Sequence, residues 1–327
     1  MKFSVLICTR NGARVIDEVI YSIINQTEIN EIIEVILVHT LTTDSTCEIV
    51  SKILEKTNIQ LKEIKSDVLG KSPALTLGLD AALGDFIAIV DDDNILALDY
   101  IYEARKILTN ANIGLLGSQG IIDENLILPL WFLDYKSDYA IGLPVQDNVT
   151  DWVWGAGSIV NKKAWEKLRE MGFDFMLNGS RVSNSSAVIG GGDDVELSLA
   201  LKLLKYEIVI SENVKYKHHF PQKRINEDYL LENNRNTCQS VAIHAIYRTI
   251  LYFPYKNIFL SQLAWHFRIA KNLLACIIII IISTLKNNKL KRKYYQSTFF
   301  GILFGFISYR ADFKKIYIYL LKIYEKN

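Results

Sequence analysis

The chain has 327 residues, enough for one large α/β domain and an additional segment. Its net charge of +1 provides no global positive field, so we expect no nucleic acid partner. The four cysteines are widely separated and form no metal-binding spacing among themselves, which is typical of a protein in a reducing compartment.

Strand and helix patterns alternate through the first 90 residues. Apolar strands are predicted at 3–8, 34–38, 59–64 and 85–90. Helical patterns lie between them at 13–25, 45–56 and 72–83. This alternation predicts a mostly parallel, doubly wound sheet flanked by helices. Because Met1 and Lys2 lead directly into the first strand, we expect no signal peptide.

Three aspartates and an asparagine, Asp91 to Asn94, directly follow the apolar residues 86–90. Burying unpaired charge is costly, so the strand must end at a polar surface that also offers positive charge. Ligands bind outside the carboxyl ends of strands in open α/β sheets, and oxygen ligands suit Mg²⁺ or Mn²⁺. The alternative is a solvated acidic loop.

The middle of the chain is richer in glycine, asparagine and tryptophan, as expected where a site is built on loops. A strand is predicted at 158–160, after Gly155-Ala156-Gly157. Three glycines precede Asp193 and Asp194, a helix is predicted at 195–204, and a strand at 207–210.

Two apolar segments follow the change of composition near residue 250. The first, 272–285, contains six successive isoleucines, and the second covers 299–307. Both are shorter than the roughly 20 residues that a membrane span needs. Basic residues lie between them: Lys286, Lys289, Lys291, Arg292 and Lys293. We expect a helical hairpin that lies in or dips into an anionic leaflet. The alternative is a helix pair packed on the catalytic domain or on another subunit.

Several motifs occur in an order that resembles the family 2 glycosyltransferases with a GT-A fold. The matching stretches are 4–12, 34–38 with 43–46, 70–74, 84–94, 154–157, 192–197 and 218–221 with Arg224. The resemblance covers about residues 1 to 235. It implies a glycosyltransferase catalytic domain over 1–235, followed by a helical, membrane-associating region over 236–327.

The resemblance also implies an inverting enzyme of the hexosyltransferase type at the cytoplasmic face of the cell membrane. It would use Mn²⁺ or Mg²⁺, a nucleotide-diphospho-sugar donor, and a glycan or lipid-linked acceptor. Asp194 matches the catalytic base, and Asp93 and His218 match metal ligands, with His219 as the alternative to His218. The implied substrate-binding residues are Thr9, Arg10, Asn11, His39, Asp44, Lys71, Asp91, Asp92, Trp154, Gly155, Asp193 and Arg224.

The chain departs from the family pattern in ways that bear on the donor. His39 stands where the family has an aspartate that contacts the base, and Arg10 replaces an aromatic residue. Thr76 replaces a common asparagine, and Asp193 replaces a glutamate. Two other functions therefore stay open: a sugar nucleotidyltransferase, and a non-catalytic subunit of a glycan-assembly complex.

Overall fold

The computed structural model describes residues 1–144, 150–178 and 191–326, and the chain divides into two compact units. The first unit comprises Met1–Glu170 and Tyr206–Pro221, and the second comprises Met171–Lys205 and Gln222–Asn327. The expected division into a catalytic domain of residues 1–235 and a membrane-associating region of 236–327 stays a prediction.

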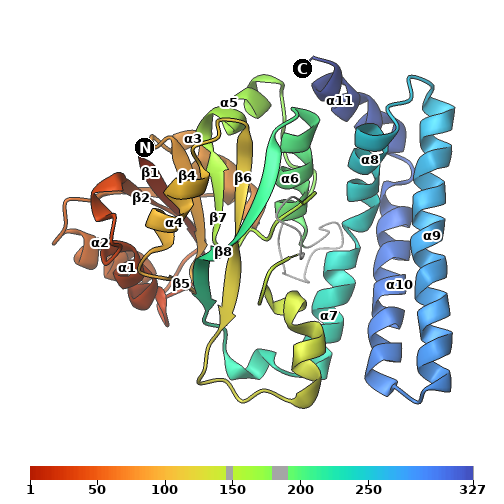
Figure 1. Cartoon of the computed structure of the whole chain (residues 1–327), viewed down its shortest axis with the longest axis horizontal. Helices are drawn as coiled ribbons and strands as arrows, with labels where there is room; N and C mark the ends of the chain where they lie inside the picture. The colour runs from red at the N-terminus through yellow and green to blue at the C-terminus, as the bar shows by residue number, and fades with distance from the viewer. Residues whose placement is uncertain (145–149, 179–190, 327) are drawn as a thin grey trace. The chain divides into compact units, whose positions relative to one another are not determined.

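The first unit is built on an eight-stranded sheet (Figure 1). The strands are β1 (Phe3–Thr9), β2 (Ile32–Thr40), β3 (Gln60–Ser66), β4 (Phe86–Asp91), β5 (Asn94–Leu96), β6 (Ile113–Ile122), β7 (Ser158–Asn161) and β8 (Glu207–His218). Their spatial order is β3-β2-β1-β4-β7-β6-β8-β5. The strands β3, β2, β1 and β4 pair in parallel, while β7 pairs antiparallel with both β4 and β6.

The strand register brings polar residues together at the carboxyl ends of the parallel strands. Thr9 lies beside His39, and Cys8 lies beside Asp91. The short strand β5 then pairs antiparallel with β8, which sets Asn94 opposite His218. Asp91, Asp92 and Asp93, which we call the acidic run, connect β4 to β5 and therefore lie next to the end of β8.

Helices cover both faces of this sheet. The helices of the first unit are α1 (Ile16–Ile24), α2 (Thr46–Leu54), α3 (Lys71–Ala81), α4 (Tyr100–Ile107) and α5 (Lys162–Glu170), with 3₁₀ turns η1 (Ile29–Glu31) and η2 (Leu130–Tyr139). The helices α1, α2 and α4 share one hydrophobic core with alternate residues of β1, β2 and β4. On the other face, α3 approaches β1 closely at Gly78, where an added Cβ would lie 2.1 Å from a methyl carbon of Leu6. The predicted α/β fold, a mostly parallel sheet flanked by helices, is confirmed.

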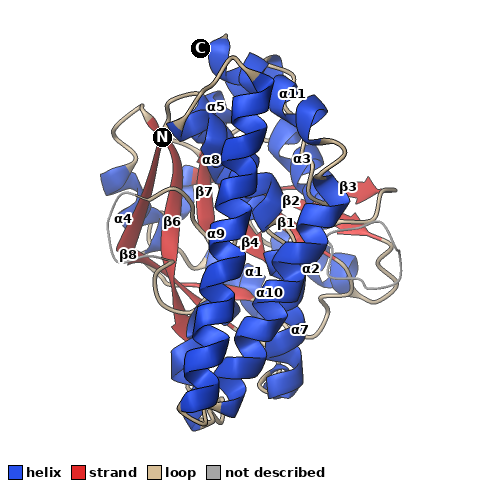
Figure 2. Ribbon diagram, turned by 90° about the vertical axis from the view of Figure 1, so that its right-hand side faces the viewer, coloured by secondary structure: helices blue, strands red, loops and turns tan. Residues whose placement is uncertain are grey.

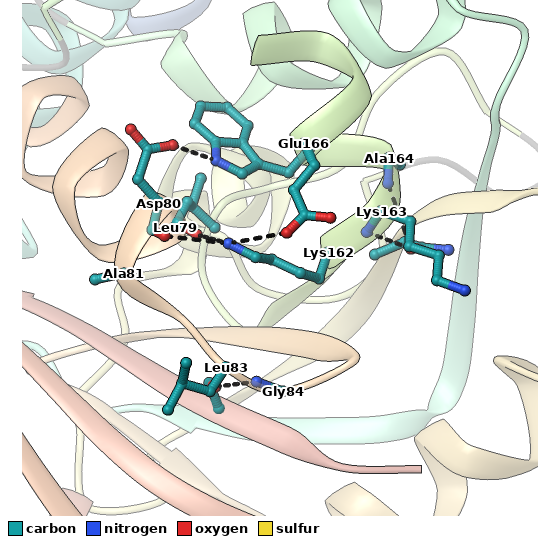
Figure 3. Close-up of polar contacts among 12 residues, drawn as sticks. Leu79, Asp80, Ala81, Leu83, Gly84, Lys162, Lys163, Ala164 and Glu166 are labelled. Carbon is teal, nitrogen blue, oxygen red and sulfur yellow. Dashed lines mark hydrogen bonds and ion pairs between the residues drawn. The ribbon is translucent and has the colours of Figure 1, made fainter. Parts of the chain in front are cut away.

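Two side chains of α5 hold the carboxyl end of α3 (Figure 3). The Lys162 ammonium donates to the carbonyls of Leu79 and Asp80 at 2.8 and 3.2 Å. The Trp165 indole donates to the Asp80 carboxylate at 2.8 Å. The last carbonyls of a helix have no partner inside it and carry partial negative charge, so cations stabilise this end. These contacts tie α3 to α5.

The second unit is helical in its described residues. It contains α6 (Asp193–Leu203), η3 (Gln222–Arg224), α7 (Glu227–Cys238), α8 (Val241–Tyr252), α9 (Ile258–Leu285), α10 (Lys289–Tyr309) and α11 (Phe313–Glu325). The helices α9 and α10 lie side by side (Figure 2). With 28 and 21 residues they are much longer than the two predicted apolar segments. By length and composition, α9 is the one helix in the described residues that could cross a membrane.

Candidate functional site

The acidic run lies at the end of β4 and is held by residues from two other elements. The Lys71 ammonium, at the start of α3, lies 2.6 Å from an Oδ1 oxygen of Asp91. The Thr9 hydroxyl, at the end of β1, donates to Asp92 at 2.5 Å. The structure therefore brings together four of the predicted substrate-binding residues.

Asp92 has an unusually basic carboxylate. Desolvation by burial, followed by the negative charge of Asp93, raises its pKa to about 6. The hydrogen bond from Thr9 acts in the opposite direction. Gly12 packs against this pair so closely that an added Cβ would lie 2.8 Å from both the Asp92 carboxylate and the Thr9 hydroxyl. A cation placed at this edge would favour the ionised carboxylate.

His218 and Asp93 face each other across the pairing of β8 with β5. The Nδ1 atom of His218 lies 2.8 Å from the carbonyl oxygen of Tyr139. Because a carbonyl can only accept, Nδ1 carries the proton, and in the neutral ring Nε2 is the nitrogen with a lone pair. That Nε2 atom lies 3.4 Å from the Asp93 carboxylate. A histidine oriented by a backbone carbonyl in this way presents a metal-binding nitrogen.

His219 points to the other side of β8, as alternation along a strand requires. Its Nδ1 atom lies 2.8 Å from Asp123, and its backbone N–H donates to the Asp93 carbonyl at 2.7 Å. Of the two adjacent histidines, His218 is thus the one whose ring faces the Asp93 carboxylate. The metal-binding role of His218 and Asp93 stays a prediction.

The turn after β1 is fixed by side chains that were predicted to bind substrate. Asn11 has a positive φ of 62°, and its side-chain oxygen accepts from the Thr43 N–H at 2.8 Å. Asp44 accepts from the N–H groups of Ala13 and Thr46, both at 3.1 Å. Desolvation acts to raise the pKa of Asp44, but the hydrogen bonds from Thr46 and Ala13 outweigh it and leave this pKa lowered. Asn11 and Asp44 therefore order the turn.

The remaining predicted residues of the first unit lie at different depths. Arg10 is exposed, whereas Trp154 is only 9% exposed and packs edge-on against Trp152 with ring centroids 6.3 Å apart. Gly155 forms part of the turn before β7, where its carbonyl accepts from the N–H and hydroxyl of Ser158. The predicted sugar contact of Trp154 stays a prediction.

His39 lies in a cluster that sequence reasoning missed. Its Nε2 atom is 3.2 Å from the Glu63 carboxylate, and Cys47 completes the group. The three residues are separated along the chain and meet only because β2, α2 and β3 are neighbours in the fold.

In the second unit, the two aspartates begin α6. Asp193 is the first helical residue and is buried, while the half-buried Asp194 accepts from the Val195 N–H at 2.8 Å. Carboxylates at a helix N-terminus are stabilised by the helix dipole. Arg224 lies in η3, with its guanidinium 6.0 Å from the centre of the Tyr229 ring.

Two buried residues that sequence reasoning missed hold the start of α6 in place. The His244 ring donates to the Gly192 carbonyl at 2.9 Å, and burial lowers the pKa of His244 to about 3. Glu196 is fully buried and accepts from the Leu177 N–H at 2.9 Å and the Tyr247 hydroxyl at 3.0 Å. Burial raises the pKa of Glu196 to about 7. A glutamate followed by the apolar residues Leu197 and Leu199 in the predicted helix is a sequence signal that could have indicated its burial.

Comparison with known proteins finds a glycosyltransferase family and individual glycosyltransferases. The model of the family described as "Glycosyl transferase family 2" matches residues 4–166. The poly(ribitol-phosphate) beta-N-acetylglucosaminyltransferase TarS of Staphylococcus aureus is 29% identical over 108 residues. That match covers 33% of this chain and 19% of TarS, so the chain spans less than a fifth of the length of this curated relative. An uncharacterized glycosyltransferase of Nostoc sp. is 27% identical over 126 residues, 38% of each chain.

Solved structures show the same fold. The mannosyltransferase PcManGT from Pyrobaculum calidifontis, in complex with GDP-Man and Mn²⁺, aligns with a TM-score of 0.58 at 17% identity over 95% of this chain and 87% of that chain. Residues 1–349 of Staphylococcus aureus TarS, in complex with UDP-GlcNAc, align with a TM-score of 0.51 at 18% identity over 95% and 92% of the two chains. At this level of identity the likeness concerns the fold.

Proposed function

Because the chain belongs to glycosyl transferase family 2, we propose that it is an inverting, metal-dependent glycosyltransferase. It transfers a sugar from a nucleotide-diphospho-sugar to a hydroxyl group of a glycan or lipid-linked acceptor. The similar structures that contain GDP-Man or UDP-GlcNAc support a nucleotide-sugar donor.

The observation that carries the proposal is the arrangement of charged groups at the ends of β4 and β8. Asp93 offers a carboxylate and His218 an imidazole nitrogen without a proton, and these two atoms lie 3.4 Å apart. This donor set fits a divalent cation, and the imidazole favours Mn²⁺ over Mg²⁺. When bound, the cation neutralises the charge that grows on the diphosphate leaving group. The presence of Mn²⁺ in the PcManGT structure supports this assignment.

The protein's own groups supply the rest of the chemistry. The Lys71 ammonium, already paired with Asp91, adds positive charge where the diphosphate would lie. Asp194 accepts the proton of the acceptor hydroxyl as that oxygen attacks the anomeric carbon. Asp194 lies in the first turn of α6, where the helix dipole stabilises negative charge, and this position suits a general base. Attack opposite the departing diphosphate inverts the anomeric configuration.

A donor screen tests the proposal. Purified protein is incubated with UDP-, GDP- and dTDP-sugars in the presence of Mn²⁺, Mg²⁺ or a chelator, and release of the nucleoside diphosphate is measured. We expect release from at least one donor, with loss on chelation and recovery on adding Mn²⁺. NMR of the transferred sugar should show inversion. Release that is unaffected by chelation would contradict metal dependence. In a parallel incubation with nucleoside triphosphates and sugar phosphates, release of pyrophosphate would indicate a nucleotidyltransferase.

We further propose that the second unit binds the cytoplasmic face of the cell membrane, where a lipid-linked acceptor would be found. Apolar side chains are exposed at helical spacing along α9, among them Leu274, Ile278, Ile281 and Leu285. On α10, Phe300, Phe304 and Ile307 continue this apolar surface. The narrow buried face of α9, which includes Trp265, packs inside the unit instead. The basic residues between the helices suit an anionic leaflet.

Co-sedimentation with vesicles tests this surface. We expect the full chain to bind vesicles that contain anionic lipid, and the double variant Ile278→Asp/Ile281→Asp to bind at least about tenfold more weakly, since each buried isoleucine contributes about 1.5–3 kcal/mol. Leu133→Asp serves as a matched control, because Leu133 is an exposed apolar residue of the first unit. Equal binding by both variants would refute the proposal, and a stable dimer without vesicle binding would assign the surface to a second copy.

A further inference from the structure

Three side chains of different chemistry converge beside β2, β3 and the start of α2. They are His39 near the end of β2, Cys47 in the first turn of α2, and Glu63 in β3. One ligand atom from each lies within 4.8 Å of the others. This group is made of different residues from the Asp93 and His218 pair and does not depend on the proposed sugar transfer.

The spacing fits a small tetrahedral ion. The Nε2 atom of His39 and the Oε1 atom of Glu63 are 3.2 Å apart. Two ligands that are each 2.0–2.1 Å from a tetrahedral zinc ion lie about 3.3 Å from one another. The third ligand, the Cys47 sulfur, lies within 4.8 Å of the other two atoms. A sulfur and a nitrogen that share one tetrahedral zinc ion are about 3.6 Å apart, so a small shift of the Cys47 side chain would suffice. Little movement is therefore needed for the three atoms to share one ion.

The backbone around the cluster is rigid, and the histidine is removed from water. His39 and Glu63 belong to adjacent parallel strands, and Cys47 lies in a regular helix. The His39 side chain is only 14% exposed. Within the described part of the chain, its buried Nδ1 atom has no hydrogen-bond partner. Metal binding through Nε2 requires that the ring proton stay on Nδ1, so the atom that the ring offers to a cation is Nε2, beside the Glu63 carboxylate.

We propose that His39, Cys47 and Glu63 form a binding site for Zn²⁺, with a water molecule as the fourth ligand. A thiolate with an imidazole selects zinc over Mg²⁺ and Mn²⁺, which prefer oxygen ligands. The thiolate and the carboxylate together balance the charge of the ion. The bound ion would join β2, α2 and β3, and so would stabilise the turn that contains Asp44, which directly precedes α2.

Metal titration of the full chain tests the site. The chelator-treated protein is titrated with Zn²⁺ in competition with a chromophoric chelator, and separately with Co²⁺, whose bond to a thiolate gives a charge-transfer absorption. We expect one Zn²⁺ per chain that is retained in the Asp93→Ala variant, no displacement of this ion by millimolar Mg²⁺, and a thiolate-to-cobalt band. Cys47→Ser and His39→Ala should each weaken Zn²⁺ binding by about 100-fold, because each removes one of the three protein ligands of the ion.

Matched variants separate this site from other thiols and from the acidic run. Cys238→Ser removes another half-buried cysteine and should leave zinc binding and the cobalt band unchanged. Glu63→Gln changes a partly exposed side chain, so it provides a test should Cys47→Ser not fold. Absence of stoichiometric zinc binding in the wild type would overturn the proposal. So would zinc binding that is unaffected by Cys47→Ser or Glu63→Gln but is lost in Asp93→Ala.

Discussion

Replacement of Glu196 by glutamine should make the protein more stable at high pH. Glu196 is fully buried, and burial raises its pKa from 4.5 to about 7. Between these two values the folded protein keeps a proton that the unfolded chain has already released. Stability therefore falls as pH rises from about 4.5 to 7 and then levels off at a value about 3 kcal/mol lower.

Glutamine has the shape of the protonated acid but cannot ionise. At pH 5, where wild-type Glu196 is mostly protonated, the difference between the two proteins is a reference value. It reflects the new amide, whose NH₂ group cannot accept from the donors that contact both carboxyl oxygens. At pH 8.5 the wild type carries the cost of the buried charge, so the difference should grow by about 2–3 kcal/mol in favour of Glu196→Gln. The hydrogen bonds from Leu177 and Tyr247 already oppose the rise in pKa and are included in its value of about 7.

Urea unfolding followed by far-UV circular dichroism at pH 5, 6, 7, 8 and 8.5 measures the difference. Glu232→Gln, an exposed glutamate of α7, is the control for the loss of one carboxylate and should show a difference that does not vary with pH. The reasoning would be refuted if the difference between wild type and Glu196→Gln were constant from pH 5 to 8.5, or if it grew in favour of the wild type.

Three substitutions test the proposed reaction. Asp194→Asn should lower kcat by a factor of about 10²–10⁴, the usual contribution of a general base, while donor affinity measured by calorimetry stays unchanged; normal turnover would remove Asp194 from this role. Asp93→Ala should abolish the effect of Mn²⁺ on donor affinity, and an Mn²⁺ effect of wild-type size would argue against a metal ligand at this position. Lys71→Met leaves Asp91 without its ion-pair partner, so donor binding followed by calorimetry should weaken by at least about tenfold. Donor affinity equal to that of the wild type would show that Lys71 does not contact the diphosphate.

The alternation of strands and helices could be predicted because each element has its own local pattern. The buried strand before Asp91 is apolar throughout, and Gly78 marks the close approach of α3 to β1. The prediction placed the last strand at 207–210, but β8 continues to His218. Its second half alternates polar and apolar residues, and it is held by pairing with β5 and β6, which lie far away in the sequence.

The details of the site depend on contacts that a sequence pattern does not contain. Alternation along a strand requires that His218 and His219 face opposite sides, but only the pairing with Asn94 decides which of them faces Asp93. The neighbours of His39 were missed for the same reason. Cys47 and Glu63 reach it through the lateral order of parallel strands, which is set by the whole fold.

The helices of the second unit are longer than the apolar segments that predicted a helical hairpin. Apolar runs were expected at 272–285 and 299–307, whereas α9 and α10 extend well beyond them. Polar residues such as Arg268 and Lys271 interrupt hydropathy but do not interrupt a helix, because their side chains have good helix propensity. Hydropathy therefore indicates which surface is apolar, and propensity decides where the helix ends.

Helix α3 is held at both ends and so connects two distant points of the first unit, Asp91 and Lys162. Its first residue, Lys71, pairs with Asp91, and its last carbonyls are held by Lys162, about 16 Å away for an eleven-residue helix. A rigid helix transmits small shifts from one end to the other. Variation at Lys162 could thus adjust the position of the Lys71 ammonium, and with it the preference for a donor, without any change among the residues that surround the acidic run.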